Sequence, residues 1–374
     1  MKTAVVILNW NTEGFLKKFL PSLLHSVKNV EGAEVIVADN DSTDGSMVLM
    51  EELFPKVRTI VFDNNCGFTG GYNRAFKQIE AEYYLLINSD IEVSDGWLEP
   101  LVKWMDSHPE CGACAPKLHS WYERDRFEYA GAAGGYIDRY GYPFCRGRIM
   151  NHLEQDMGQY DNASPEVFWA SGACLMVRSS VYNMLNGLDS RFFAHMEEID
   201  LCWRMQLAGY SVCIVPESTV YHVGGGTLPS TSPFKLFLNF RNNLLMLENN
   251  LARTYALKRY REMDVYDSSS ARKAAIKGMK DAQRIMQMRT VMDAMSAAVY
   301  LMTFRFNSFK SVRKAHKDFR RLSRQSDAES IAEFITTHKD STVKGIYDKW
   351  IIFQSFRKRR MTCKDINGSD FQKI

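Results

Sequence analysis

Short apolar runs alternate with helical patterns along the first quarter of the chain. The runs are too short for buried helices and are rich in branched and aromatic residues, which is typical of central strands. Four runs are expected to be strands: Thr3–Leu8, Val35–Ala38, Val57–Phe62 and Tyr83–Ile87. Three helices are expected between them: Glu13–Ser26, Met47–Phe54 and Arg74–Glu80. This order predicts an α/β fold, with a mostly parallel central sheet flanked by helices.

Polar residues follow three of these strands where each strand ends, at Asn9, Asp39 and Asn88. The carboxyl ends of parallel strands meet at one edge of a sheet, where α/β proteins bind ligands. Asn88-Ser89-Asp90 closes the last run, and an Asp there can hold Mg²⁺ or Mn²⁺ that bridges phosphates. An Asx turn that ends the strand is the other interpretation of this tripeptide alone. We therefore expect one site at this edge.

The remaining part of the globular region is predicted with fewer regular elements. Helices are expected at Trp97–Ser107, Ser179–Leu185 and Glu197–Ala208, the last ended by Gly209. Strands are expected at Cys111–Pro116, Val167–Val177, Val212–Val215 and Thr219–His222. Residues 117–165 are rich in glycine and aromatic residues and are expected to form loops and irregular hairpins. Gly224-Gly225-Gly226 is expected to end the globular region, which gives a catalytic domain at 1–230 and an extension at 231–374.

The amino terminus and the cysteines indicate the cellular compartment in which the protein is expected. The start MKTAVVILNW has one Lys and only a short apolar run, so we expect a strand and not a signal peptide. Eight scattered cysteines then indicate free thiols in a reducing cytosol. The pair Cys111 and Cys114 has redox spacing, but no second pair completes a zinc site. No run of 18 apolar residues occurs, so no spanning helix is expected.

Helical patterns with many cations dominate from Phe234 onward. Lys310–Arg324 has cations on one helical face and apolar residues on the other, which suits the surface of an anionic membrane. A helix packed on the domain with a solvated basic face is the alternative, and self-association of the extension also stays open. Arg357–Arg360 adds a basic cluster, but no base-reading motif accompanies it, so no nucleic acid partner is expected.

Seven motifs occur in a fixed order between Thr3 and Leu245: VVILNWN, VIVADNDSTDGS, NNCGFTGGYNRA, LLINSD, WASGACLMVR, GLDSRFFAHMEEIDLCWRMQLAGY and Val220-Tyr221-His222. Together they resemble the family 2 glycosyltransferases of GT-A fold, in particular the rhamnosyltransferase-like branch that builds bacterial surface polysaccharides. The resemblance implies a Rossmann-like sheet and inverting transfer of a sugar from a nucleotide-sugar donor to a glycan or lipid-linked acceptor. It favours dTDP-rhamnose as donor and leaves UDP-hexoses open.

The resemblance also assigns the donor site. In the family, the residue matching Asp39 accepts a hydrogen bond from the pyrimidine N–H. Helix capping is the other role for Asp39, although Ser42 and Asp44 could serve there equally well. The glycine-rich motif at a helix start would let backbone approach the anionic oxygens of a ligand. The nucleotide-sugar-binding residues are then Asn9, Asn11, Asp39, Asn65, Gly67, Gly71, Asn73, Ser89, Asp90 and Trp169. Trp169 could equally lie in the core.

Asn88-Ser89-Asp90 matches the D-x-D position of the family with its first carboxylate replaced by Asn. Asp90 is then the main ligand for a divalent metal, Mg²⁺ or Mn²⁺, and the departure suggests a weakly held ion that arrives with the nucleotide. His222 matches a position that can contribute an imidazole to the metal or the diphosphate. A purely structural histidine at a strand end is the alternative.

Glu197, Glu198 and Asp200 match the acidic segment that holds the general base in the family. The base position is Glu198, where relatives usually have Asp, and Glu197 and Asp200 remain candidates. Mutual repulsion would raise at least one pKa and favour proton acceptance. An acidic helix start that complements the helix dipole is the bland interpretation, and it explains one acid better than three. The pair Arg241-Asn242 echoes the branch, but the sequence assigns it no role.

Rival functions have weaker support in the sequence. A dinucleotide-binding oxidoreductase needs G-x-G-x-x-G after the first strand, and a nucleotidyltransferase needs a glycine-rich basic loop there; this chain has Asn9-Trp10-Asn11-Thr12. A non-catalytic sugar-nucleotide-binding partner of a polysaccharide assembly complex stays open because Glu replaces Asp at residue 198. We expect a cytoplasmic enzyme, with peripheral contact at the inner face of the cell membrane as one role of the basic extension.

Overall fold

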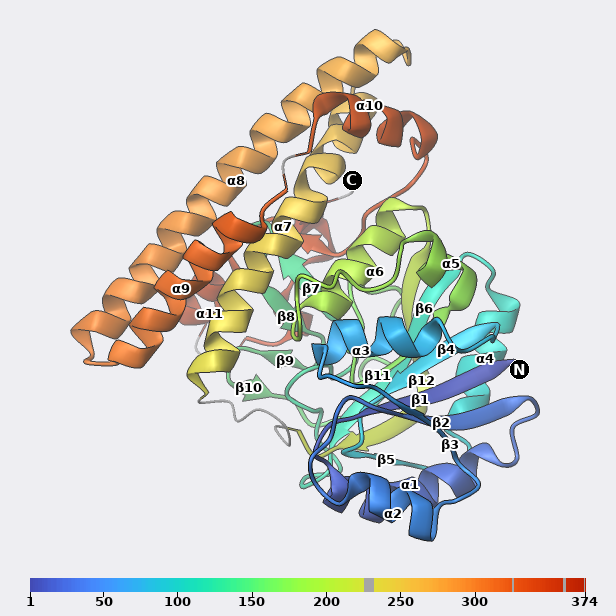
Figure 1. Cartoon of the computed structure of the whole chain (residues 1–374). Coiled ribbons are helices and arrows are strands. Elements are labelled where there is room, and N and C mark those ends of the chain that lie inside the picture. Colours follow the sequence, from blue (N-terminus) through green and yellow to red (C-terminus); the bar gives the residue numbers. More distant parts are fainter. Residues whose placement is uncertain (225–231, 325, 359–360, 373) are drawn as a thin grey trace.

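An eight-stranded sheet forms the centre of the amino-terminal part of the molecule (Figure 1). The structure is a computed structural model, and it describes all residues except 225–231, 325, 359–360 and 373. The strands lie in the order β3 (Arg58–Val61), β2 (Ala33–Asp39), β1 (Thr3–Asn9), β4 (Tyr83–Ile87), β11 (Cys174–Arg178), β6 (Cys111–Ser120), β12 (Ser211–His222) and β5 (Ile91–Val93). Only β11 and β5 run antiparallel to their neighbours within this sheet. The predicted mostly parallel sheet is confirmed.

The register of β1 brings the three polar strand ends to one edge. Asn9 is paired with Asp39 on β2, and Ile7 is paired with Ile87 at the end of β4. Asn88 therefore follows β4 beside the end of β1. The shared edge that the sequence predicted is formed by direct strand pairing.

Helices cover both faces of this sheet. Strand residues alternate in direction, so Val5 and Ile7 join one core while Ala4 and Val6 join the other. The first core includes α1 (Glu13–Val27), α2 (Ser46–Leu53) and α4 (Leu98–Ser107). The second includes α3 (Gly67–Phe76), α5 (Ser179–Met184) and α6 (Glu197–Leu207). Figure 1 shows the two sets on opposite sides of the strands.

Three local predictions were wrong. Helix α3 begins at Gly67 and not at Arg74, because Gly67 and Gly71 allow the helix to approach Phe193 and Leu8 where a Cβ would collide with their side chains. Only the end of Val167–Val177 is a strand, since β11 begins at Cys174. The two short strands expected at 212–222 are one strand, β12, with a register shift between Val215 and Thr219. These features depend on packing that a local pattern does not contain.

A second, smaller sheet joins the region after β6 to the carboxyl-terminal end of the chain. Its strands follow the order β10 (His152–Leu153), β9 (Arg148–Ile149), β8 (Pro143–Cys145), β7 (Gly135–Asp138), β13 (Ile346–Tyr347) and β14 (Phe371–Gln372). The irregular hairpins expected within 117–165 are thus present. Strand β13 pairs in parallel with β7, so the extension completes a sheet of the preceding region. The predicted boundary at 230/231, like the expected end at Gly225-Gly226, lies outside the described residues.

Long helices form most of the extension, as predicted. They are α7 (Pro233–Arg261), α8 (Ser268–Met302), α9 (Phe306–Leu322), α10 (Ala328–Thr337) and α11 (Ile351–Arg357). In Figure 1, α7, α8 and α9 lie side by side along one flank of the sheet domain, and α7 also packs on α6. Within the described part of the chain, no helix combines the length and apolarity needed to cross a bilayer. The apolar face of α9 is covered, because Val312 and Ala315 are buried.

Small residues bring α7 and α8 into close contact. Ala271, Ala274 and Ala275 on α8 are almost fully buried. A Cβ added at Gly278 would lie 2.4 Å from the backbone nitrogen of Ala256 and 2.8 Å from the carbonyl oxygen of Ala252 on α7. Backbone atoms cannot move aside as a side-chain end can. The two helices can therefore lie this close only while residue 278 has no side chain.

We expect Gly278→Ala to destabilise the protein by about 1–3 kcal/mol, because the added methyl group forces α7 and α8 apart. Urea unfolding followed by circular dichroism measures this change. Gly14→Ala is the matched control, since nothing lies within 4 Å of a Cβ at that helical position. It should be neutral or stabilising by up to about 1 kcal/mol. Equal stability of the Gly278→Ala variant and the unaltered protein would contradict the close packing of α7 on α8.

Candidate active site

The carboxylate of Asp39 lies at the end of β2 with one partner on each oxygen. Its Oδ1 accepts from the Asn9 side chain at 2.7 Å, and its Oδ2 accepts from the backbone N–H of Ser42 at 3.0 Å. Asp44 is the acid that bonds the backbone N–H at the start of α2, through Ser46, as well as that of Glu13 at the start of α1. Asp39 is 1% exposed and is not needed as a cap, so its remaining lone pairs can accept another donor.

Asn9 and Asn11 hold the loop that follows Asp39. Asn9 is fully buried and also contacts Ser42, while its Oδ1 accepts from Thr12. The Oδ1 atom of Asn11 accepts from the backbone of Thr43 at 2.7 Å. Both side chains thus fix the position of Asp39 and its loop, and the polar atoms of Asn9 are occupied by the protein itself.

The glycine-rich motif joins this loop to the start of α3. Asn65 Oδ1 accepts from the N–H of Gly67 at 2.8 Å and from the side chain of Asn40 at 2.9 Å. Asn40 was not singled out from the sequence, yet it also bonds Cys66 and Gly67. Asn73 points elsewhere: it bonds Tyr182 and both backbone groups of Leu188, so it fixes the segment after α5.

Asp90 and His222 meet at the other side of the strand edge. His222 Nε2 lies 3.2 Å from Asp90 Oδ1, and His222 Nδ1 lies 3.4 Å from Glu128 Oε1. Burial lowers the pKa of His222, but the two carboxylates outweigh burial and raise it to about 10. Burial raises the pKa of Asp90, and the hydrogen bond and charge of His222 more than offset this, so the Asp90 pKa is lowered. Ser89 is half-buried beside this pair. Glu128 is a partner that the sequence did not reveal.

Two of these side chains could hold a divalent cation. Asp90 and His222 present one carboxylate and one imidazole side by side, which suits Mn²⁺ or Mg²⁺ when a diphosphate supplies further oxygens. No cluster of three or more His, Cys, Asp or Glu side chains suited to a metal ion occurs among the described residues. Ligation by His222 would require the neutral imidazole, so a cation would have to displace the proton that Asp90 and Glu128 favour. The pair fits a weakly held ion.

The three acids at the start of α6 have different surroundings. Asp200 is fully buried and accepts from Arg204, Asn249 and Asn250 at 2.7, 2.8 and 2.9 Å. Glu197 and Glu198 each have one buried oxygen, Oε2, without a partner among the described residues. The structure thus separates Asp200, which stabilises α6 against α7, from the two glutamates.

Burial raises the pKa of Glu198 to about 7, and its own helix amides offset part of that rise. Burial and the neighbouring charge of Glu198 hold the Glu197 pKa well above its usual range. Glu198 also lies beside the strand edge, because a Cβ added at Gly172 would meet Glu198 Cβ at 3.3 Å. The next residue, Ala173, accepts from the N–H of Asn88 at 2.9 Å. A half-buried acid that exchanges its proton near neutral pH therefore adjoins the Asn88–Asp90 segment.

Trp169 lies in the core. It is 5% exposed, its ring packs on Gly135, and its Nε1 donates to the carbonyl of Tyr136 at 3.0 Å. The indole therefore joins the large sheet domain to the smaller sheet. This outcome corresponds to the alternative role stated for Trp169.

A strained segment precedes α6. Phe193, His195 and Met196 have φ values of 65°, 71° and 73°, a left-handed conformation that costs each such residue about 1–2 kcal/mol. Arg241 and Asn242 of α7 hold the segment in place. Asn242 Nδ2 donates to the carbonyls of Phe192, Ala194 and His195 at 2.7–2.9 Å, and Arg241 Nη2 donates to that of Phe192 at 2.7 Å. The Arg-Asn pair thus fixes the start of the helix that carries Glu198.

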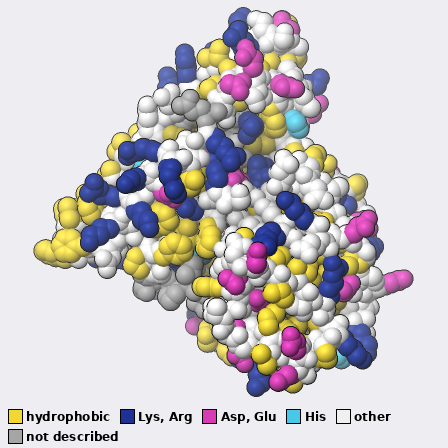
Figure 2. Space-filling model, in the orientation of Figure 1, with side chains coloured by type: hydrophobic (Ala, Val, Ile, Leu, Met, Phe, Trp, Pro, Cys, Tyr) yellow, Lys and Arg dark blue, Asp and Glu magenta, His cyan; other side chains and the backbone are white. Residues whose placement is uncertain are grey.

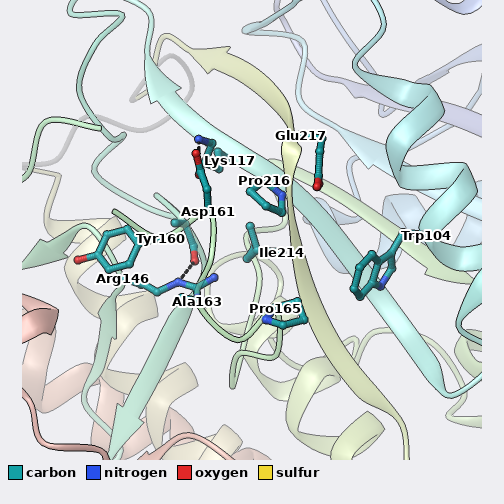
Figure 3. Close-up of a pocket in the computed structure, with 11 residues that line it drawn as sticks. Trp104, Lys117, Arg146, Tyr160, Asp161, Ala163, Pro165, Ile214, Pro216 and Glu217 are labelled. Carbon is teal, nitrogen blue, oxygen red and sulfur yellow. Dashed lines mark hydrogen bonds and ion pairs between the residues drawn. The ribbon is translucent and has the colours of Figure 1, made fainter. Parts of the chain in front are cut away.

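A cavity beside β6 and β12 lies apart from these residues (Figure 3). Lys117, Arg146, Tyr160 and Ile214 are among its lining residues, and none of the predicted site residues is. Lys117 Nζ is already paired with Asp156 at 2.8 Å and with Asp161 at 2.9 Å. The charge of Lys117 is therefore already neutralised by these two carboxylates and is not free to bind a ligand in the cavity.

We expect Asn242→Ala to loosen the left-handed segment, because the carbonyls of Ala194 and His195 lose this donor and that of Phe192 keeps only Arg241. The free energy of unfolding should fall by about 1–3 kcal/mol. Amide hydrogen exchange should accelerate in residues 192–198. Asn243→Ala is the matched control: the neighbouring side chain is equally buried but bonds the carbonyl of Gly141. It should cost stability without faster exchange at 192–198. Equal exchange in both variants would contradict the clamp.

Comparisons with known proteins agree on one family. Residues 4–181 match the model of glycosyl transferase family 2. The N-acetylglucosaminyl-diphospho-decaprenol L-rhamnosyltransferase of Mycobacterium tuberculosis is 28% identical over 233 residues, which cover 58% of this chain and 75% of the relative. Rhamnosyltransferase WbbL of Escherichia coli is 23% identical over 234 residues, covering 58% and 82%.

The fold has a counterpart among solved structures. The crystal structure of GalNAc-T7 with UDP, GalNAc and Mn²⁺ superposes with a TM-score of 0.53 at 14% identity, over 79% of this chain and 57% of the other. The GT-A fold implied by the motifs is thereby confirmed. The family that matches residues 4–181 is also the family that the sequence motifs resemble. Residues 4–181 are a glycosyl transferase family 2 domain, and the protein is a glycosyltransferase.

Proposed function

We propose that the protein transfers a rhamnosyl or another hexosyl group, with inversion, from a pyrimidine nucleotide-sugar to a lipid-linked glycan. Support for the donor comes from the two rhamnosyltransferases among its relatives, which favours dTDP-rhamnose, and UDP-hexoses remain the second choice. Support for the acceptor comes from the mycobacterial relative, whose name specifies a diphospho-decaprenol. The proposed place of action is the cytoplasmic face of the membrane.

The observation that carries this proposal is the environment of Glu198. An acid with a pKa of about 7 is the best general base near neutral pH, because it is largely ionised and still binds a proton firmly. In the proposed mechanism, the Glu198 carboxylate takes the proton of the acceptor hydroxyl as that oxygen attacks the anomeric carbon. Attack occurs opposite the diphosphate, which inverts the configuration without a covalent intermediate. Burial and the neighbouring charge of Glu198 also raise the pKa of Glu197, which is the second candidate for the base.

The donor would lie along the carboxyl ends of β1, β2 and β4. Asp39 would accept the N–H of the pyrimidine through its free lone pairs, with Asn9 and Asn11 holding its loop. Asn65, Gly67 and Gly71 would shape the wall beside it. Protonated His222 would place a positive charge at the leaving diphosphate. When bound at Asp90 and the neutral imidazole of His222, Mg²⁺ or Mn²⁺ would supply that positive charge in place of the proton.

The donor site is tested by isothermal titration calorimetry with dTDP-rhamnose, UDP-glucose and UDP-galactose, each with and without Mn²⁺. We expect one donor to bind more tightly with metal. Asp90→Asn should weaken that binding about tenfold or more and remove the metal effect, a change of about 1.4 kcal/mol or more. Asp41→Asn is the matched control, because Asp41 is exposed and its φ of 65° suits Asn. No binding of any donor by the folded protein would refute the donor site.

The base is tested by the pH dependence of turnover. Because the carboxylate accepts the proton, kcat should fall about tenfold for each pH unit below the Glu198 pKa of about 7 and level off above it. Glu198→Gln should reduce kcat about 10²–10⁴-fold and abolish this acidic limb. Glu197→Gln is the control and should keep the limb. A larger loss in Glu197→Gln would move the role of base to Glu197.

A further inference from the structure

Large apolar side chains gather at the turn between α8 and α9. We call this group the tip; it consists of Met295, Val299, Leu301, Met302, Phe304 and Phe306. Each is at least 45% exposed, and Phe304 reaches 79%. Figure 2 shows the hydrophobic surface at the extreme left of the molecule. Single exposed apolar residues are common, but a contiguous group marks an interaction surface.

The backbone holds the tip outward as a defined turn. Helix α8 ends with Thr303 and Arg305 donating to the carbonyls of Val299 and Tyr300, and Phe304 between them has a φ of 57°. A bulky residue in that conformation is uncommon and strained. The segment thus places its largest side chain in solvent, although a polar residue would serve the turn with less strain.

Cations lie beside the tip along α9. Its exposed basic side chains are Lys310, Arg313, Lys314, Lys317, Arg320 and Arg321. Lys310, Lys317 and Arg320 form no ion pair with the described residues. The other side of α9 is buried through Val312 and Ala315 and bonds α7 through Asp318 and Arg241 at 3.0 Å. Figure 2 shows the cations as a blue field next to the apolar end.

We propose that this surface docks on an anionic lipid bilayer. The tip enters the interface between headgroups and acyl chains, and the cations of α9 contact the lipid phosphates. The apolar face of α9 plays no part, because the protein covers it. The tip matches the acyl-chain layer of an anionic membrane, and the cations of α9 match its layer of headgroup phosphates. Binding of nucleic acid to the same cations would leave the tip exposed to water.

The placement of the tip suits delivery of an acceptor from the membrane, a step that rests on the proposed function. In Figure 1, β1 runs from the amino terminus at the right toward the left, so the strand ends of the site face the side on which the α8–α9 turn projects. A second copy of the chain is a poorer occupant. Two tips packed together would bring two fields of like charge side by side, and that repulsion opposes dimerisation.

Co-sedimentation of the full chain with vesicles tests this proposal. Anionic vesicles, made of phosphatidylcholine with about 30% phosphatidylglycerol, are compared with vesicles of phosphatidylcholine alone. Each kind is used at low and at high salt. We expect binding to the anionic vesicles that weakens as salt rises. The tip variant Met302→Ser/Phe304→Ser and the charge variant Lys310→Glu/Lys317→Glu/Arg320→Glu should each bind at least about tenfold more weakly.

Matched controls come from exposed residues on the sheet domain. Val48→Ser/Leu53→Ser removes two exposed apolar side chains of α2, and Lys28→Glu/Lys56→Glu/Lys77→Glu reverses three exposed cations. Both should bind vesicles as the unaltered protein does. Calorimetry with dTDP and Mn²⁺ reports on the donor site independently, so failure of the proposed donor is recognised without vesicles.

Two results would overturn the proposal. The first is absence of the unaltered protein from the anionic vesicle pellet while it remains folded. The second is a concentration-dependent dimer in sedimentation velocity that Met302→Ser/Phe304→Ser abolishes, because the tip would then be a contact between copies of the chain.

Discussion

The left-handed segment before α6 is the point on which the site depends. Three residues in an unfavourable backbone conformation set the direction of the helix that carries Glu197 and Glu198. Such a segment persists only where surrounding contacts determine it fully. Here the contacts come from Arg241 and Asn242, which belong to α7 and not to the matched family domain. The helical extension thus holds the segment from which α6 begins, and under the proposed role of Glu198 a division of the chain near residue 230 would remove that support from the base.

The sheet and the position of the site could be predicted because their signals are local. Each strand from Thr3 to Ile87 is a short apolar run, and each polar end follows directly, so Asn9, Asp39 and Asn88 were placed at one edge without any tertiary information. The acids at residues 197–200 stood out for the same reason. The sequence did not show that the three acids have different surroundings. Asp200 differs from the two glutamates because Asn249, Asn250 and Arg204 donate to its carboxylate, and only the fold brings these residues together.

Packing decides the features that the local patterns missed. Asn9 and Asn73 are polar side chains in motifs that predicted contacts with the nucleotide-sugar. In the structure, neighbouring residues of the protein bond their polar atoms. Glycines 67 and 71 signalled a loop, but the close approach of Phe193 and Leu8 uses them inside a helix. Glu128 has no motif, and only the fold brings it to His222. The basic pattern of α9 predicted its two faces correctly, while the partner of each face depends on where α7 and α8 lie.

The small sheet has a consequence for the way in which the chain matures. Strand β7 lies early in the sequence, but its neighbour β13 and then β14 come from the last residues described. While the chain is being synthesised, the edge of β7 is exposed until residues 346–347 have left the ribosome. An unpaired strand edge is a template for pairing with another chain. Pairing of β13 therefore closes this edge only after the hairpins themselves have been synthesised.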